Sequence, residues 1–219
     1  MDISEAIRQR RSIRAFRPDP VPQDILRKIL EESLRAPSWA NTQPWEFAVA
    51  TGEPLNEIRR RFLDKGSAGP CPDVPRPPGF PDLYAARIRV LDGQNRLLTP
   101  EDWDRRRVRN FNHYGAPAVI YILTRREFFY QANGTNVWAL YDCGAVVENI
   151  LLLATRYGLG TIVQAQAVVY PDVLRDVLKI PETKIIILGV AIGYPDWNDP
   201  VHQFRTEREP LDNIATWHG

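Results

Sequence analysis

The sequence predicts an α+β fold in which helices cover a mixed, mostly antiparallel central sheet. Two patterns along the 219 residues lead to this class. Segments whose apolar residues recur at helical spacing alternate with short apolar, β-branched segments. No Gly-x-Gly-x-x-Gly follows a strand-like segment, so a classical dinucleotide-binding half-domain is not expected. The length suits a single domain over residues 1–219, which can bury about 70% of its unfolded surface without disulfides or metals.

The N-terminal half is expected to contain three helices and one strand. Asp2 or Ser4 can cap the first helix, because either side chain accepts a hydrogen bond from a free backbone N–H group. Pro18, Pro20 and Pro22 then force an extended connection. The expected helices span 2–11, 22–37 and 55–63, and the expected strand spans 46–51.

The C-terminal half is expected to alternate strands with helices. Residues 138–157 are apolar nearly all round, which is typical of a helix buried in the core. Gly158 to Gly160 ends this helix as a glycine-type cap. The Pro-rich segment 66–81 and the tail 195–219 lack regular periodicity. Further expected elements are strands over 118–124, 161–166 and 184–192, a helix over 171–178, and a polar helix or lid over 103–109.

Composition argues against several classes of partner. The chain has 28 basic and 27 acidic residues, so neither nucleic acid nor a membrane surface is an expected partner. No apolar run approaches the roughly 20 residues of a membrane span, and the first residues lack the order of a signal peptide. Cys71 and Cys143 have no metal-like spacing, and the histidines do not cluster. The plain expectation is a cytoplasmic protein without a metal and with reduced thiols.

Two short segments together suggest an anionic flavin as ligand. Residues 10–14 contain three arginines, which offer bidentate donors to a doubly charged phosphate, and Ser12 adds a hydroxyl. Residues 36–45 bring an amide, hydroxyls and two indoles into a turn held by two prolines. A flat, polar, multi-ring ligand needs such edge hydrogen bonds and face contacts. Either segment alone fits a basic helix end or a Pro-rich turn, whereas their order and spacing favour the flavin.

These segments resemble the FMN-dependent nitroreductase family, whose members carry R-x-S-x-R/K and P-S-x-x-N-x-Q-P-W motifs. The likeness is greatest to bacterial members that reduce nitroaromatics, which share Gly115-Ala116-Pro117 before the middle strand. Segment 66–109 is Pro-rich and then Arg-rich; it departs from the family pattern, and substrate preference would be set there. Other segments in the family's order are 158–161, 164–165, 170–172, 180–181, 187–194 and 204–211.

The resemblance implies a set of FMN-binding residues. Contacts to the phosphate and ribityl chain are implied for Arg10, Arg11, Ser12 and Arg14. A loop that the partner subunit donates to the flavin corresponds to Pro37, Ser38, Trp39 and Asn41. The segment whose backbone N–H faces flavin N5 contains Gln164 and Ala165. Completion of the phosphate site is implied for Arg205 and Arg208, with a solvated tail charge as the alternative for both.

The resemblance also implies an intertwined homodimer, with FMN at the subunit interface and the C-terminal tail wrapped over the partner. The implied enzyme takes hydride from NADH or NADPH at flavin N5 and reduces nitroaromatic or related electron-poor acceptors in ping-pong order. Alternatives are dehalogenation, flavin fragmentation or desaturation on the same fold, and a non-enzymatic flavin-binding protein. No residue is assigned as a catalytic acid or base, because no acid–base pair has a convincing order or spacing.

Substrate contacts are expected near the middle strand and in the flavin loop. Trp39, Phe111 and Tyr114 offer aromatic faces to a small aromatic substrate such as a nitroarene. His113 has a pKa range suited to proton delivery. The alternative is an ordinary charged helix with Phe111 and Tyr114 packed beneath it, and a histidine that is only structural or exposed.

Overall fold

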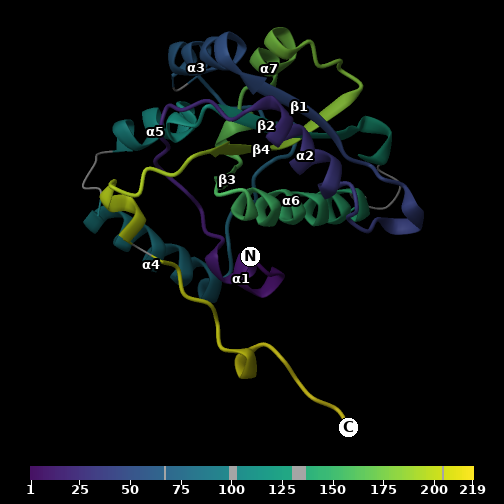
Figure 1. Ribbon diagram of the computed structural model, residues 1–219, viewed down its shortest axis with the longest axis vertical. Coiled ribbons are helices and arrows are strands. Elements are labelled where there is room, and N and C mark those ends of the chain that lie inside the picture. The colour runs from purple at the N-terminus through teal and green to yellow at the C-terminus, as the bar shows by residue number, and fades with distance from the viewer. Residues whose placement is uncertain (67, 99–102, 130–136, 204) are drawn as a thin grey trace.

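A four-stranded antiparallel sheet forms the centre of the protein (Figure 1). The computed structural model describes residues 1–66, 68–98, 103–129, 137–203 and 205–219. The strand order is β1-β2-β4-β3, and an isolated parallel bridge joins Ser12 to Thr161 of β3. The α+β class and the mostly antiparallel sheet are therefore confirmed. The strands are β1 (Glu46–Thr51), β2 (Ala118–Arg125), β3 (Gly160–Gln164) and β4 (Lys184–Gly193).

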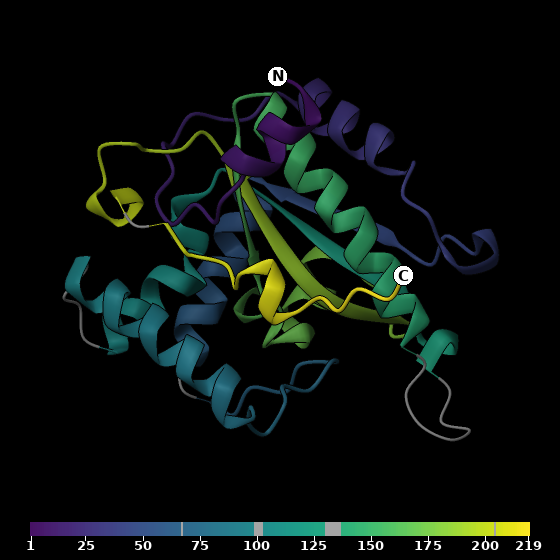
Figure 2. The same ribbon diagram turned by 90° about the horizontal axis from the view of Figure 1, so that it is seen from below.

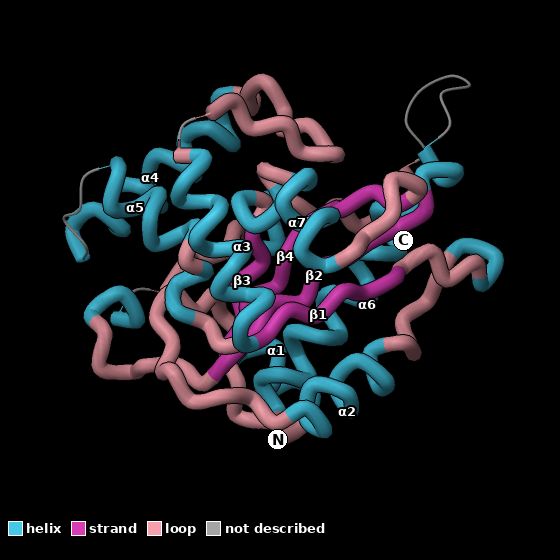
Figure 3. Tube along the Cα trace, turned by 90° about the horizontal axis from the view of Figure 1, so that it is seen from above, coloured by secondary structure: helices cyan, strands magenta, loops and turns pink. Residues whose placement is uncertain are grey.

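Helices cover both faces of this sheet (Figures 1 and 3). Helices α3, α5 and α7 lie over one face, and α1, α2 and α6 lie over the other. The sheet is therefore the middle of three layers, with one apolar cluster on each side. The helices are α1 (Ile3–Gln9), α2 (Gln23–Ser33), α3 (Gly52–Lys65), α4 (Asp82–Leu98), α5 (Trp103–Phe111), α6 (Trp138–Arg156) and α7 (Pro171–Leu178).

The central strand β2 is apolar from Ala118 to Leu123 because both of its faces are covered. Side chains of a strand point alternately to opposite faces. Ile120 and Ile122 join the cluster under α2 and α6, whereas Val119, Tyr121 and Leu123 join the cluster under α3, α5 and α7. A strand buried on both sides needs a continuous apolar run, and this run made β2 recognisable in the sequence.

Most expected elements are present, with one helix that was not expected. All four strands lie within two residues of their expected ends. Helix α2 ends at Ser33, before the expected stop at Pro37, and α3 begins at Gly52. Helix α4 was missed, and its residues Leu83, Ile88 and Val90 remain exposed.

Helix α6 is the expected core helix. Among the described helices it is the one long and apolar enough to cross a membrane by length and composition, a test that core helices also pass. Its residues Val146, Ile150 and Ala154 are buried and belong to one cluster with Leu26 and Ile29 of α2. This packing against protein on the inner side is typical of a core helix.

The C-terminal segment first crosses the N-terminal segment and then extends away from the body of the protein (Figures 1 and 2). The Asp196 N–H donates to the Ala15 carbonyl oxygen at 3.0 Å, which ties the two segments together. The final residues expose three large apolar side chains, Leu211, Ile214 and Trp217. Such side chains without a surface to cover are typical of an interaction segment.

Candidate functional site

The arginine-rich segment 10–14 lies alongside β3 and runs in the same direction. The Ile13 N–H donates to the Thr161 carbonyl oxygen at 2.9 Å. Gly160 permits this close approach, because a Cβ atom there would lie 2.4 Å from Cγ1 of Ile13. The parallel run places the first arginine of the segment toward the start of β3 and the last toward its end.

Three arginines, Arg10, Arg11 and Arg205, line a cavity of about 370 Å³ beside the start of β3. Nε of Arg10 lies 3.3 Å from Oε1 of Glu148, and the Arg11 guanidinium lies 4.6 Å from the centre of the Trp197 ring. Burial and, next, the charge of Arg205 lower the pKa of Arg11. Like charges are therefore crowded here. An anion such as a phosphate fits this cavity, because it would offset the repulsion and accept charge-assisted hydrogen bonds.

Two side chains that sequence analysis missed hold the backbone of Arg14. Its N–H donates to Nε2 of His202 at 3.1 Å, and its carbonyl oxygen accepts from Nη2 of Arg109 at 3.0 Å. Nδ1 of His202 lies 2.7 Å from the Asp196 carbonyl oxygen, so Nδ1 carries the proton and Nε2 is the acceptor. Burial, the largest effect, lowers the pKa of His202, in keeping with this neutral ring. No local motif marked His202, since it lies 188 residues from Arg14.

The aromatic loop 37–45 has a strained backbone. Ala40, Asn41 and Gln43 have φ values of 48°, 57° and 47°, in the left-handed region that non-glycine residues seldom adopt. A hydrogen bond from outside the loop holds it: the Trp39 N–H donates to Oδ2 of buried Asp142 at 3.1 Å. Strain of this kind persists only where surrounding contacts hold it, and it is concentrated at functional sites. Asp142 is a further residue that sequence analysis missed.

Ser38 and Trp39 have distinct positions in this loop. The Ser38 hydroxyl accepts a hydrogen bond from the Gln43 N–H at 3.0 Å, so it closes the turn. The Trp39 side chain is 63% exposed and therefore does not cap the core of its own chain. Pro37 lies before the turn and Asn41 ends it, also on the surface.

Within a single chain, the aromatic loop and the arginine cavity lie at opposite ends of α6. Asp142, which anchors the loop, lies near the start of α6, whereas Thr155 and Gly158 line the arginine cavity at its other end. Thirteen residues of α-helix between Asp142 and Thr155 span about 20 Å. The structure therefore brings Arg10, Arg11 and Arg205 together but does not bring the loop to them within one chain.

Gln164 and Ala165 lie at the end of β3. The Gln164 side chain is buried, and its Nε2 donates to Oδ1 of Asn110 at 2.8 Å. Its Oε1 lies 3.3 Å from Nδ1 of His113. The Gln164 side chain is thus directed into the protein, whereas Ala165 after it is exposed.

The structure corrects the substrate contacts predicted for Phe111 and His113. Their side chains are 3% and 0% exposed. The Phe111 ring packs edge-on against Phe62 with centroids 5.7 Å apart, and His113 lies between α3 and β2. Both are interior residues because the chain turns inward after α5. Tyr114 is half-buried beside the guanidinium of Arg109, which lies 6.0 Å from its ring centre.

Arg208 lies outside the arginine cavity. Its Nη1 donates to Oγ1 of Thr206 at 2.8 Å and to nearby carbonyl oxygens. It lines a separate cavity of about 310 Å³ with Arg87 and Leu91 of α4. Within one chain, Arg205 is thus the C-terminal arginine that joins the cluster, whereas Arg208 lines the other cavity, and its contact with the phosphate stays a prediction.

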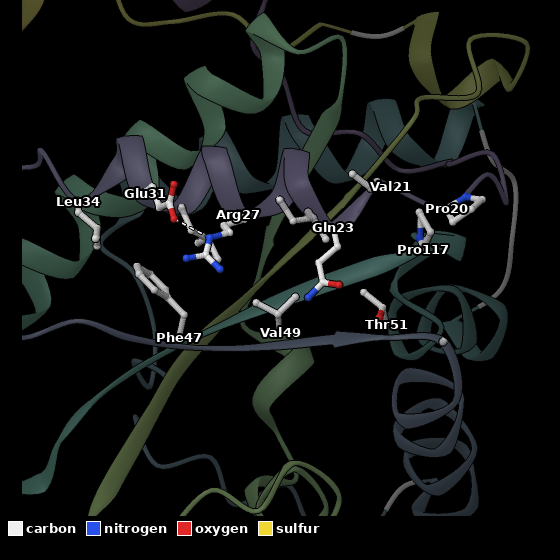
Figure 4. A pocket seen from close by; sticks show the side chains of 13 residues that line it. Pro20, Val21, Gln23, Arg27, Glu31, Leu34, Phe47, Val49, Thr51 and Pro117 are labelled. Atoms are coloured by element: carbon white, nitrogen blue, oxygen red, sulfur yellow. Dashed lines mark hydrogen bonds and ion pairs between the residues drawn. The ribbon is translucent and has the colours of Figure 1, made fainter.

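A larger groove of about 710 Å³ lies between α2 and β1 (Figure 4). Its walls are mainly apolar, from Leu34, Phe47 and Val49, and the ion pair that Arg27 and Glu31 form at 2.7 Å already satisfies its main charges. The groove lies at the β1 edge, whereas the arginine cavity lies at the β3 edge. Its one cationic lining residue, Arg27, is already paired with Glu31, whereas three arginines line the arginine cavity. Within the described ranges, no group of three or more His, Cys, Asp or Glu residues is arranged to hold a metal ion.

Fold and site together define a helix-covered sheet with a cationic cavity at its β3 edge. The model of the nitroreductase family matches residues 7–194. The chain belongs to the nitroreductase family. It is 31% identical to a 4-nitrobenzoate reductase of Nocardioides sp. (strain LMS-CY), over 96% of this chain and 87% of that protein. It is also 31% identical to a nitrobenzene nitroreductase of Ectopseudomonas oleovorans, over 98% and 96% of the two chains.

The fold is likewise that of solved relatives. The crystal structure of an FMN and NADPH-dependent nitroreductase, NfnB of Sphigopyxis sp. strain HMH, matches with a TM-score of 0.90. The match covers 100% of both chains at 27% identity. The family resemblance and the nitroreductase-like fold expected from the sequence are confirmed.

Proposed function

We propose that the protein is an FMN-dependent oxidoreductase that uses NADH or NADPH to reduce nitroaromatic or related small electron-poor acceptors. The observation that carries this proposal is the cluster of Arg10, Arg11 and Arg205 beside β3, in a chain of the nitroreductase family. When bound, FMN supplies the redox chemistry: it accepts hydride at N5 from the nicotinamide and then passes electrons to the acceptor, in ping-pong order.

Segment 10–14 runs parallel to β3, so its successive residues can follow FMN from the phosphate toward the ring. Arg10, Arg11 and Arg205 hold the phosphate at the start of β3, with the Ser12 hydroxyl next along the ribityl chain. The backbone at the end of β3, where Ala165 follows Gln164, would then hold the flavin ring on its N5 side. Arg14 lies toward the ring end of the segment, where its positive charge favours the reduced, anionic flavin.

The site is completed in a homodimer, with FMN at the subunit interface. The distance of about 20 Å along α6 separates Pro37, Ser38, Trp39 and Asn41 from the arginine cavity of their own chain. A partner related by a two-fold axis supplies its loop to this cavity. Exposed Tyr141 and Trp138 of α6 supply apolar surface for the contact, and the tail from Leu211 onward wraps over the partner.

The substrate lies against the exposed face of the flavin. Trp39 of the donated loop offers an aromatic face, and Tyr114 lies beside Arg109. We treat segment 66–109 as the variable cover of the site, in a single domain over 1–219. A small, flat aromatic acceptor suits such a site. No side chain is assigned as an obligate acid or base. We place the protein in the cytoplasm, in keeping with two free cysteines, Cys71 and Cys143.

Anaerobic reduction of the purified protein tests this function. The protein is expected to carry FMN, identified by chromatography after heat release, and its visible spectrum is expected to bleach on addition of NADH or NADPH. A nitroarene added afterwards restores the colour in an enzyme of this class. A yellow protein that neither nucleotide bleaches would instead be a flavin carrier, and a colourless protein that does not take up added FMN would overturn the proposal.

A further inference from the structure

A buried polar group lies between α3, β2 and the end of β3, outside the arginine cavity. His113 is fully buried, and its Nδ1 lies 3.3 Å from Oε1 of Gln164. The Gln164 amide nitrogen donates to Asn110, so Oε1 is the atom that faces the imidazole. Because Oε1 can only accept, Nδ1 of His113 carries the proton and Nε2 is a free acceptor.

Charged and titratable groups around His113 keep it neutral. Arg59 of α3 and Tyr121 of β2 are the titratable neighbours, and Gln164 of β3 and Phe62 of α3 complete its surroundings. Burial, and then the charge of Arg59, lower the pKa of His113 to about 3. Burial also raises the pKa of Tyr121, so its hydroxyl keeps its proton.

Three buried polar atoms of this group complement one another. Nε of Arg59, Oη of Tyr121 and Nε2 of His113 have no hydrogen-bond partner among the described residues. Two of them are donors and the third is an acceptor. A water molecule can accept from the two donors and donate to the imidazole, which satisfies all three atoms, and buried polar atoms are seldom left unsatisfied.

We propose that His113 is a positioning residue, which holds Gln164 through Nδ1 and is itself fixed by an internal water shared with Arg59 and Tyr121. The group thereby fixes the end of β3, whose backbone faces the flavin ring. This inference rests on the proposed FMN site. It assigns a role to a histidine that touches no ligand.

The backbone at this position supplies a matched control. His113 has a φ of 49°, in the left-handed region that asparagine tolerates better than most residues. In the variant His113→Asn, the amide nitrogen takes about the place of Nδ1 and still donates to Gln164. In His113→Leu the donor is lost. Tyr121→Phe removes only the hydroxyl and leaves the ring in the core.

The test uses the FMN-loaded protein at pH 7.5 and measures three quantities: the Kd of FMN by fluorescence, the visible absorption band of bound FMN, and the melting temperature. His113→Leu is expected to raise Kd roughly tenfold, as loss of one hydrogen bond does, and to shift the band. His113→Asn is expected to retain the band and to raise Kd by less than about threefold. Tyr121→Phe is expected to lower the melting temperature by about 2–4 °C.

The outcomes separate the inference from the function on which it rests. If His113→Leu lowers only the melting temperature while Kd and the band stay unchanged, His113 is a packing residue and the inference is wrong. If Tyr121→Phe raises the melting temperature, the hydroxyl is unsatisfied and no water joins it to His113. If His113→Leu does not fold, the inference is tested by the absorption band and Kd of His113→Asn and by the melting temperature of Tyr121→Phe. A wild-type protein that binds no FMN would overturn the proposed function as well.

Discussion

Replacing Arg205 by alanine should weaken FMN binding far more than the same change at Arg208. Arg205 lines the cavity with Arg10 and Arg11, whereas Arg208 folds back onto Thr206 and lines another cavity. A hydrogen bond between charged groups contributes about 1.5–3 kcal/mol, so Kd should rise roughly 10- to 100-fold for Arg205→Ala. The lower end is expected, because removal of Arg205 also relieves its repulsion of Arg11 in the unloaded protein.

The two variants are compared by titration of flavin-free protein with FMN, followed by flavin fluorescence at one protein concentration. Arg208→Ala is the matched control, and its Kd should change by less than about threefold. The difference in Kd between the two variants should shrink at high salt, because the screening length for partly exposed charges is about 3 Å at 1 M ionic strength. Equal losses in both variants, or a greater loss for Arg208→Ala, would show that the tail rearranges and that the cavity seen in one chain is not the phosphate site.

Two further outcomes follow from the same structure. The unfolded pKa of histidine near 6.5 exceeds that of folded His113, about 3, so His113 contributes stability that is full above pH 6.5 and is lost as pH falls toward 3. Between pH 6.5 and 5 the free energy of unfolding should fall by about 2 kcal/mol, at about 1.4 kcal/mol per pH unit. Urea unfolding should show this fall in wild type and not in His113→Asn, which retains His202. The same dependence of unfolding free energy on pH in both proteins would contradict the prediction. Light scattering of the FMN-loaded protein should give the mass of two chains. Mixing Arg10→Ala chains with Asn41→Ala chains should restore flavin binding in part, because one of the two sites in each heterodimer is then intact. If binding is not restored, Arg10 and Asn41 belong to a site formed by one chain.

The strands and the core helix were predictable because their signals are local. Segment 118–123 is a continuous apolar run, and only a strand or helix buried on all sides accommodates such a run. Residues 138–156 are long and apolar enough to be a core helix whatever their partners. The arginines of segment 10–14 and the aromatic loop were recognisable for the same reason: the chemistry of each is contained within a few neighbouring residues.

Tertiary structure alone decided how these parts combine. Sequence could not assign His202 to Arg14 or Asp142 to Trp39, because these partners lie 188 and 103 residues apart. Nor could it decide whether Phe111 contacts a substrate or packs beneath its helix, since its segment is rich in arginine and its burial depends on packing against α3. Local pattern determines which elements form, whereas the side chains that are covered and the atoms that meet depend on contacts between elements remote in the chain.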